Sequence, residues 1–226
     1  MAAFAVALFT GAKAQLYIQG GVNLANITKT TSGQTEKNNM LTTFNAGILD
    51  RFGLSKLVDL ESGILFTGRG SKAETYYTSG NTTDNYVKTK FNPYYVEVPL
   101  NLVVRVPVKG IHGLFFHAGP YAAIGVAGKS TTDQKLIGIS SHSENNIQFA
   151  NDNPFTSRQE DASYYKLKRF DFGLNAGGGF DLGKLLLKVN YGYGLTKINS
   201  TESNNVSDDK NKYRTLSFSV GIPIGK

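Results

Sequence analysis

Residues 169–182 read Arg-Phe-Asp-Phe-Gly-Leu-Asn-Ala-Gly-Gly-Gly-Phe-Asp-Leu. Every second position from Phe170 to Leu182 is apolar or glycine, and the positions between hold charged residues, asparagine or glycine. Because successive side chains of a β-strand point to opposite faces, this stretch predicts a strand with one apolar face and one face that is polar or very small.

The same alternation recurs elsewhere along the chain. Residues 185–196 alternate Leu, Val and Tyr with Lys, Asn, Gly and Thr, and residues 215–224 alternate Leu, Phe, Val and Ile with Thr, Ser and Gly. Between Val96 and Val106 an aliphatic stripe is opposed by Glu97, Pro99, Asn101 and Arg105. In these stretches the polar face is the compact one, which is typical of a small barrel with a filled polar interior and lipid outside.

The whole chain predicts an all-β fold: an eight-stranded antiparallel up-and-down transmembrane β-barrel. The connectors alternate between turns of a few residues and long polar loops, with short turns expected near Ser55-Lys56, at 109–113 and at Gly183-Lys184. In bacterial barrels the short turns face the periplasm and the long loops face outward. The predicted strands are 15–26, 41–53, 57–68, 91–106, 114–127, 166–182, 185–198 and 213–224, and the long loops are 28–39, 69–90, 129–165 and 199–212. Within the 129–165 loop, Ile147-Gln148-Phe149 is a candidate local strand. Pro99 and Pro120, which each remove a hydrogen bond from a strand ladder, predict bulges or kinks.

Composition agrees with an outer-membrane location. No run of eighteen apolar residues offers a transmembrane helix, whereas a spanning strand needs only about nine to eleven residues. Tryptophan is absent, so an aromatic girdle must be built from tyrosine and phenylalanine. The net charge of +7 is scattered through the loops. We therefore expect solvated or lipopolysaccharide-facing cations and outer-membrane lipid as the partner, with no nucleic-acid partner.

The first fourteen residues predict the remnant of a signal peptide. Ala2 to Thr10 is a short apolar run, and Ala12-Lys13-Ala14 before Gln15 fits the small-x-small rule for cleavage after Ala14. The expected organisation is a leader at 1–14 and one outer-membrane barrel domain at 15–226.

From Gln15 onward the chain resembles the outer-membrane β-barrel domain family of the Bacteroidetes, which includes PorT-like proteins and is related in architecture to the OmpA and OmpX barrels. The resemblance rests on the Ala12-to-Gln15 junction and on residues 94–100 (Tyr-Tyr-Val-Glu-Val-Pro-Leu), 177–181 (Gly-Gly-Gly-Phe-Asp) and 216–221 (Leu-Ser-Phe-Ser-Val-Gly). It implies a barrel in the bacterial outer membrane and, as partners, other envelope or secretion proteins.

A set of charged residues shares the inward parity of its strands and forms the candidate site. The set is Asp59, Glu61, Glu97, Arg105, Arg169, Asp171, Asp181 and Lys188. The first interpretation is a network of ion pairs that fills the lumen, because an eight-stranded barrel is just wide enough to be filled by side chains. The alternative is a proton-linked site or an ion-selective constriction, and hence a narrow passive pore, for which an uncompensated ring of one sign would be needed.

An outer-membrane enzyme with catalytic residues at the outer rim is the less favoured alternative, and no residue pattern predicts a cofactor. Cysteine is absent, and only His112, His117 and His142 could act as imidazole bases. None has the spacing of a metal site or a demonstrable nucleophile. We therefore expect a monomeric, non-enzymatic barrel without cofactor or metal, whose four exposed loops serve envelope integrity, adhesion or contact with a secretion machine.

Overall fold

The computed structural model describes residues 14–31, 34–36, 40–79, 82–109, 112–151, 166–198 and 210–224. The expected leader thus falls outside the described residues except for Ala14. The described strands are β1 (Ala14–Thr31), β2 (Gln34–Glu36), β3 (Leu41–Gly53), β4 (Val58–Gly68), β5 (Ser71–Ser79), β6 (Thr82–Val106), β7 (Gly113–Leu136), β8 (Ile139–Asn146), β9 (Gln148–Ala150), β10 (Lys166–Lys168), β11 (Phe170–Asp181), β12 (Leu186–Gly194) and β13 (Lys210–Pro223). Within these ranges no helix is long and apolar enough to cross a membrane, a finding that has no bearing on crossing by strands.

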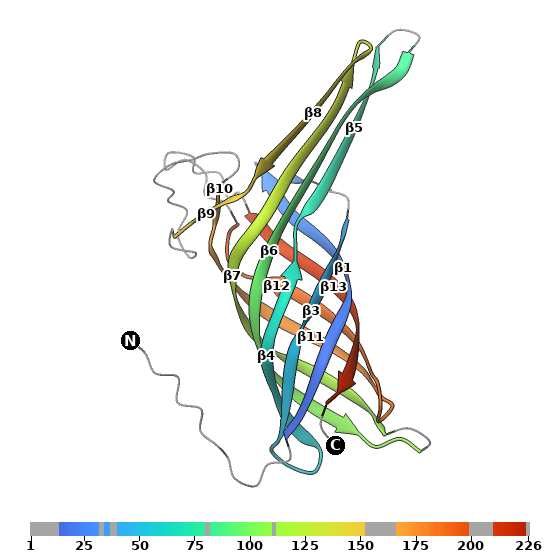
Figure 1. Cartoon of the computed structure of the whole chain (residues 1–226), viewed down its shortest axis with the longest axis vertical. Helices are drawn as coiled ribbons and strands as arrows, with labels where there is room; N and C mark the ends of the chain where they lie inside the picture. Colours follow the sequence, from blue (N-terminus) through green and yellow to red (C-terminus); the bar gives the residue numbers. More distant parts are fainter. Residues whose placement is uncertain are drawn as a thin grey trace.

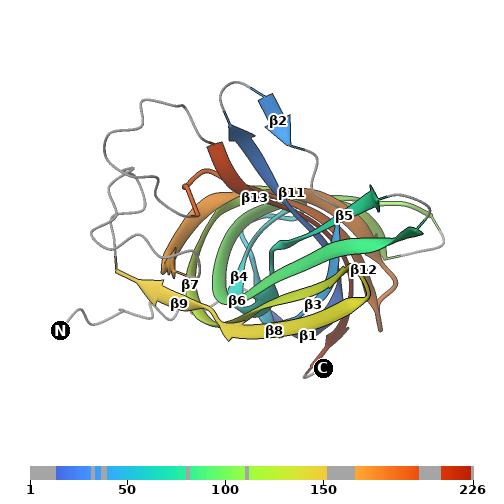
Figure 2. The same ribbon diagram turned by 90° about the horizontal axis from the view of Figure 1, so that it is seen from above.

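Eight long strands form a closed antiparallel ring. In the order β1, β3, β4, β6, β7, β11, β12 and β13 each pairs with the next, and β13 pairs back with β1. Barrel neighbours in space are thus also neighbours along the chain. Figure 1 shows the tilted strands from the side, and Figure 2 looks down the barrel from above. The predicted eight-stranded up-and-down barrel is confirmed, and its closure leaves no unpaired edge within the ring.

Exposed and buried side chains alternate along the strands of the barrel wall, as the sequence predicts. On β6, Leu100 is 47% exposed whereas Glu97 and Asn101 are buried. On β12, Leu187 is exposed and Lys188 is buried. The side chains that point outward are therefore the apolar ones, as a lipid-facing wall requires.

Aromatic rings gather on the outside of the wall over β3, β4 and β6. The ring centroids of Phe66 and Tyr94 lie 5.4 Å apart, and Phe44 lies 5.9 Å from Phe66 and 5.8 Å from Tyr94. Phe44 is near the end of β3 that leads to the long loops. This cluster suits the outer interface of a membrane, where aromatic side chains form girdles.

The short turns all lie at one end of the barrel. The backbone N–H of Leu54 donates to the carbonyl of Val58 at 2.9 Å, and that of Leu182 donates to the carbonyl of Leu185 at 2.9 Å. β1 begins and β13 ends at this same end, the lower one in Figure 1. By the rule for bacterial barrels this end is periplasmic.

At the opposite end the structure differs from the sequence prediction. Residues 71–79, 82–90 and 129–146, expected to be loops, extend the barrel wall as β5, the first half of β6, the second half of β7, and β8. These four segments pair in the order β5-β6-β7-β8 and form a sheet that projects well beyond the barrel (Figure 1). We call them the extracellular sheet. In water neither face needs to be apolar, so the alternation that marks the membrane strands is missing there.

Three further differences concern strand ends. The candidate strand at 147–149 exists as β9, which pairs in parallel with β10; residues 166–168 therefore belong to this short pair and not to the barrel strand. The connector predicted at 28–39 contains the end of β1 and β2, which pair with each other. The register shift in the β6–β7 pairing lies between Tyr94 and Tyr95, whereas the pairing beside Pro99 keeps its register.

Candidate functional site

The barrel interior is polar and filled. Buried side chains on its inward face include asparagines, threonines and serines from most strands of the ring, together with charged residues that are 0–7% exposed. A buried charge is expensive unless it is paired and hydrogen-bonded, so the partners of these charges decide what the interior can do.

Glu61 is the centre of the first ion-pair group, and its side chain is fully buried. Lys188 Nζ donates to Glu61 Oε1 at 2.5 Å, and Arg51 Nε donates to Glu61 Oε2 at 2.9 Å. The Tyr17 hydroxyl donates to Oε2 at 2.6 Å, and Asn101 Nδ2 donates to Oε1 at 3.1 Å. We call these five residues the Glu61 cluster.

The Glu61 cluster extends across the full width of the barrel. Glu61 is on β4 and Lys188 is on β12, which lie four strands apart in the ring of eight and hence opposite each other. The Arg51 guanidinium carbon lies 4.1 Å from the centroid of the Phe115 ring of β7, which adds a cation–π contact to a third wall. Side chains from β3, β4, β7 and β12 therefore close the barrel at this level.

Arg69 is the centre of the second group and its side chain is 4% exposed. Its Nη2 donates to Glu97 Oε2 at 2.5 Å, and its Nη1 donates to Asp171 and, at 3.2 Å, to the Tyr121 hydroxyl. The Tyr121 hydroxyl in turn donates to Asp171 Oδ2 at 3.0 Å. Asn175 Nδ2 donates to Glu97 Oε1 at 2.9 Å, which satisfies the second oxygen of that carboxylate.

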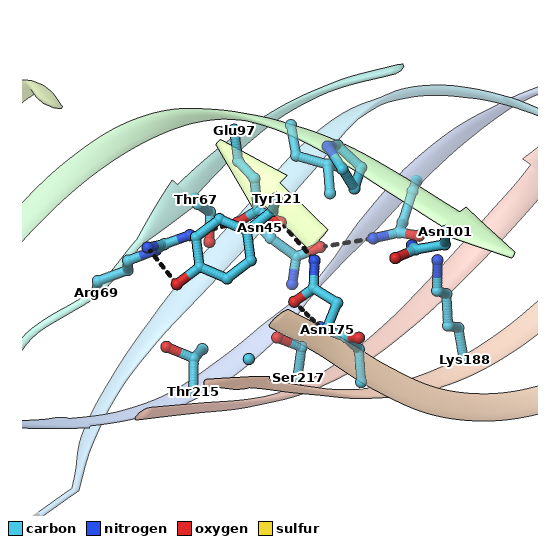
Figure 3. Close-up of a pocket in the computed structure, with 15 residues that line it drawn as sticks. Asn45, Thr67, Arg69, Glu97, Asn101, Tyr121, Asn175, Lys188, Thr215 and Ser217 are labelled. Atoms are coloured by element: carbon cyan, nitrogen blue, oxygen red, sulfur yellow. Dashed lines mark hydrogen bonds and ion pairs between the residues drawn. The ribbon is translucent and has the colours of Figure 1, made fainter. Parts of the chain in front are cut away.

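Thr196 also donates its hydroxyl to Asp171. The Arg69 cluster therefore consists of Arg69, Glu97, Tyr121, Asp171, Asn175 and Thr196. Figure 3 shows Arg69 directed toward Tyr121 and Glu97. Because both carboxylates share one guanidinium and also accept from neutral donors, each buried charge of the cluster has a partner.

A third pair lies nearer the periplasmic end. Arg105 Nη2 donates to Asp59 Oδ1 at 2.8 Å, with the Arg105 side chain 44% exposed and Asp59 buried. Across the three groups four acids face four bases, so the described interior of the barrel carries no uncompensated ring of one sign.

The structure brings together six of the eight candidate residues and separates two. Glu61 and Lys188 are in one cluster, Glu97 and Asp171 in another, and Asp59 pairs with Arg105. Arg169 and Asp181 join none of these groups.

Both of these separated residues take backbone partners instead. Arg169 Nη2 donates to the carbonyl oxygen of Phe149 at 3.1 Å, because Arg169 lies between β10 and β11, where the chain enters the barrel. Asp181 Oδ1 accepts from the backbone N–H of Gly183 at 2.7 Å and so fixes the turn after β11.

Sequence reasoning missed the two arginines that carry most of the pairing. Arg51 shares the parity of Thr43, Asn45 and Leu49 on β3, and Arg69 continues the inward parity of β4. Both arginines continue the inward parity of their strands, but the predicted strand 57–68 ends one residue before Arg69.

Between the two clusters lies a layer of amides and hydroxyls. Asn45 Nδ2 donates to Asn23 Oδ1 at 2.6 Å, Asn23 Nδ2 donates to Thr67 Oγ1 at 2.9 Å, and Ser219 Oγ donates to Asn45 Oδ1 at 3.1 Å. A cavity of about 40 Å³ remains in this region, lined by members of both clusters (Figure 3). That volume holds a few water molecules and leaves no room for a larger solute.

An apolar and aromatic layer closes the interior at the extracellular end. Tyr95, Tyr121 and Tyr213 are buried there with Ile147, Leu167 and Ile198. Phe149 of β9 packs edge-on against Tyr95 with ring centroids 5.7 Å apart. The β9–β10 pair thus supplies Leu167 and Phe149 to this layer, a role that the sequence did not indicate.

The extracellular sheet carries its own surface pairs. Lys129 Nζ donates to Glu144 Oε1 at 2.6 Å across the β7–β8 hairpin, and this hydrogen bond and the charge of Lys129 lower the pKa of Glu144. On the β5–β6 hairpin the Tyr76 hydroxyl donates to Glu74 at 3.1 Å and lowers the pKa of Glu74. Such exposed pairs orient side chains but add little stability.

No metal-binding constellation occurs among the residues that the structure describes: no three His, Cys, Asp or Glu side chains converge. His117 Nε2 lies 2.9 Å from Asn190 Oδ1, and His142 Nδ1 lies 2.5 Å from Asp133 Oδ1. Each imidazole therefore has a polar neighbour, but neither lies beside a nucleophilic hydroxyl in these contacts.

The closed ring of strands, its apolar exterior and its interior of paired polar groups together define a small transmembrane β-barrel of the bacterial outer membrane. The chain belongs to the family of outer membrane protein beta-barrel domains, whose sequence profile matches residues 11–200.

Solved structures with a similar arrangement include Ail, the attachment invasion locus protein of Yersinia pestis, at 14% identity, 93% coverage of this chain, 99% coverage of that chain and a TM-score of 0.43. Neisserial surface protein A is similar at 12% identity, with 93% and 99% coverage and a TM-score of 0.40. OprG from Pseudomonas aeruginosa is similar at 9% identity, with 94% and 97% coverage and a TM-score of 0.30. No curated protein sequence shows significant similarity to the chain.

Proposed function

We propose that this protein is a non-conducting, non-enzymatic anchor that holds the extracellular sheet outside the outer membrane, where the sheet recognises an external partner. The observation that carries the proposal is the bond between Lys188 and Glu61, 2.5 Å long and directed straight across the barrel. A lumen bridged in this way has no open path at that level.

Further bridges support a filled barrel. Arg69, which follows β4, contacts Asp171 of β11, three strands away in the ring. Tyr95 of β6 meets Tyr213 of β13, four strands away. Four acids balanced by four bases also argue against the alternative of an ion-selective pore, which needs an excess of one sign.

The extracellular sheet supports the recognition role. Strands β6 and β7 extend far past the membrane, and β5 and β8 add to them, which builds a platform that a barrel serving only to fill the membrane would not need (Figure 1). A partner in a secretion machine, as the PorT-like resemblance implies, would dock on this platform or on the periplasmic turns.

The test has two arms. Purified protein, refolded and checked by heat-modifiable migration on a gel, is examined in planar bilayers; we expect no discrete conductance steps. In the second arm residues 74–88 and 131–144 are each replaced by a two-residue Asn-Gly turn, which trims the extracellular sheet and leaves the barrel whole. We expect normal insertion but loss of binding to target cells; reproducible conductance, or unchanged binding by the trimmed protein, contradicts the proposal.

A further inference from the structure

The hairpin that joins β7 to β8 ends in an apolar tip. Its four residues are Leu136, Ile137, Gly138 and Ile139, which we call the distal tip. Ile137 is 87% exposed and Ile139 is 75% exposed, and Leu136 is also exposed. In Figure 1 this hairpin reaches the end of the molecule farthest from the periplasmic turns. Three large aliphatic side chains are thus held in water at the far end of the extracellular sheet, beside the β5–β6 hairpin, in which β6 extends past Asn85 to Thr82.

The turn of the distal tip contains an isoleucine at a position where that residue destabilises the backbone conformation. Ile137 has φ = 51° and Gly138 has φ = 79°, so both lie in the left-handed region. A two-residue hairpin turn of this kind prefers Asn-Gly, and a β-branched residue at positive φ is strained. The backbone N–H of Ile137 donates to Asn85 Oδ1 of β6 at 2.8 Å, which holds the strained residue in place. Strain that is held in this way commonly marks a functional position.

Behind the distal tip the side chains become amphipathic. Tyr76 of β5 and Tyr86 of β6 are paired across the strands, and Tyr86 is paired with Lys135 of β7, one residue before Leu136. Tyr77 is 49% exposed and Tyr76 is 59% exposed. The ring centroids of Tyr76 and Tyr86 lie 6.4 Å apart.

Lys88 lies on β6 two residues beyond Tyr86, farther from the tip. Lys88 Nζ lies 4.8 Å from the Tyr86 ring centroid and 5.5 Å from that of Tyr76. Lys88 pairs with Asp133, three residues before Leu136, which places it about 10 Å below the tip at the rise of a β-strand. From the tip inward the aliphatic residues are therefore followed by the level of Tyr76, Tyr86 and Lys135, and then by Lys88.

This order matches the depth profile of a membrane interface: hydrocarbon, then the level where tyrosine is enriched, then headgroups that attract lysine. We propose that the distal tip inserts into a lipid bilayer apposed to the outer surface of the cell. The inference rests on the proposed recognition role of the extracellular sheet and names its partner.

Two features favour a bilayer over a protein receptor as the occupant. The tip is convex and purely aliphatic, so it fits a fluid hydrocarbon layer without a shaped pocket. Only two or three residues of the β7–β8 hairpin would pass the headgroups, so the unpaired backbone edge of β8 remains where water can satisfy it.

The experiment uses the full chain in nanodiscs together with separate phosphatidylcholine vesicles that carry brominated acyl chains. The chain contains no tryptophan, so Ile137→Trp supplies a single fluorophore at the tip. We expect a blue shift and quenching of Ile137→Trp on addition of the vesicles, and neither for Ser141→Trp, a matched control at an exposed position of the same hairpin.

Binding is measured by co-flotation of the same nanodiscs with the vesicles. We expect Ile137→Asn to lower the bound fraction about tenfold or more while it leaves folding intact, because asparagine suits the turn and cannot contribute the apolar burial. Equal flotation of Ile137→Asn and the wild type, or equal quenching of the two tryptophan variants, overturns the inference.

The outcomes also separate this inference from the proposed function. If the trimmed protein loses binding to cells while Ile137→Asn keeps it, the sheet recognises a partner by another surface and only the lipid inference fails. If cell binding is lost on protease treatment of the target cells and no vesicle binding occurs, the partner is a protein and the lipid inference fails. If neither variant changes cell binding, both proposals fail.

Discussion

Tyr95 and Tyr213 meet hydroxyl to hydroxyl at 3.2 Å across the barrel, from strands that lie opposite each other in the ring. Their rings are 5.5 Å apart at an angle of 71°, an edge-to-face contact. The Arg69 guanidinium carbon lies 5.3 Å from the centroid of Tyr95 and 5.7 Å from that of Tyr213. The two tyrosines therefore form the cover of the Arg69 cluster, and removing one should expose that cluster from the extracellular side.

The Tyr95–Tyr213 contact can be divided into a hydroxyl part and a ring part. Tyr213→Phe removes one hydrogen-bonding group and should lower the free energy of unfolding by about 0.5–1.5 kcal/mol. Tyr213→Ala also leaves a cavity and should lower it by about 3–5 kcal/mol. Urea unfolding in lipid vesicles measures both. Tyr193→Phe, at an exposed outward position, serves as the control and should have no effect.

Glu61→Gln should be the most damaging single change of charge in the interior. It leaves Lys188 and Arg51 buried without their shared carboxylate, and removing one partner from a buried ion pair typically costs about 3–5 kcal/mol. The same urea titration measures the loss. Glu74→Gln, the same chemical change on the exposed β5–β6 hairpin, should leave the unfolding curve unchanged. Equal stability of the two variants would show that the Glu61 cluster does not hold the barrel together.

The lipid-facing wall predicts an effect that depends on depth. Leu187→Arg and Leu100→Arg, both outward and exposed near mid-strand, should each cost about 2–4 kcal/mol because arginine would face hydrocarbon. Leu54→Arg, in the periplasmic turn, should cost at most about 1 kcal/mol because the side chain reaches water. Unfolding in vesicles of defined thickness checks the three values. A cost for Leu54→Arg as large as that for Leu187→Arg would place the membrane boundary elsewhere.

The membrane strands could be predicted from sequence because lipid and lumen impose opposite demands on alternate residues. Leu187 and Lys188 are neighbours in the chain, yet one is exposed and the other buried, and no other arrangement of β12 would satisfy both environments. The same logic placed Glu61, Glu97 and Asp171 on the inward face. It could not pair them, because the partner of an inward charge depends on strand stagger and on the length of the side chain.

The extracellular sheet could not be found in this way. Strand β8 is Ile-Ser-Ser-His-Ser-Glu-Asn-Asn, almost entirely exposed, and no apolar face marks it as a strand. Residues 71–79 of β5 offered a weaker signal in their two threonines and two tyrosines, which favour strands, but charges interrupt any periodicity. Hydrogen bonding to β6 and β7, strands already fixed by the membrane, is what orders both edges.

The Lys129–Glu144 pair predicts a pH dependence of the β7–β8 hairpin. The folded-state pKa of Glu144 lies below its ordinary value of 4.5 because Lys129 donates a hydrogen bond to it, and the same contact raises the pKa of Lys129. The contribution of the pair is therefore complete at neutral pH and is lost as the pH falls below 4.5 through the folded-state pKa. NMR titration of the Glu144 carboxyl carbon should give a midpoint below 4.5, and Lys129→Met should raise that midpoint. An unchanged midpoint in Lys129→Met would mean that the pair does not persist in solution.

The turn of the distal tip predicts two substitutions of opposite sign. Gly138 has φ = 79° and an added methyl group would meet nothing within 4 Å, so Gly138→Ala is opposed by backbone strain alone and should destabilise the hairpin by about 1 kcal/mol. Ile137→Asn places a residue that tolerates the left-handed region where a β-branched one stands, and should stabilise the hairpin by about 0.5–1 kcal/mol.

Hydrogen exchange of the β8 amides measures the free energy of local opening in both variants. Because β8 pairs only with β7 among the described strands, the change should appear in that hairpin and leave the exchange of β12, deep in the ring, as it was. Slower exchange in Ile137→Asn, together with its loss of vesicle binding, would show that the isoleucine is kept at the tip at the expense of the turn.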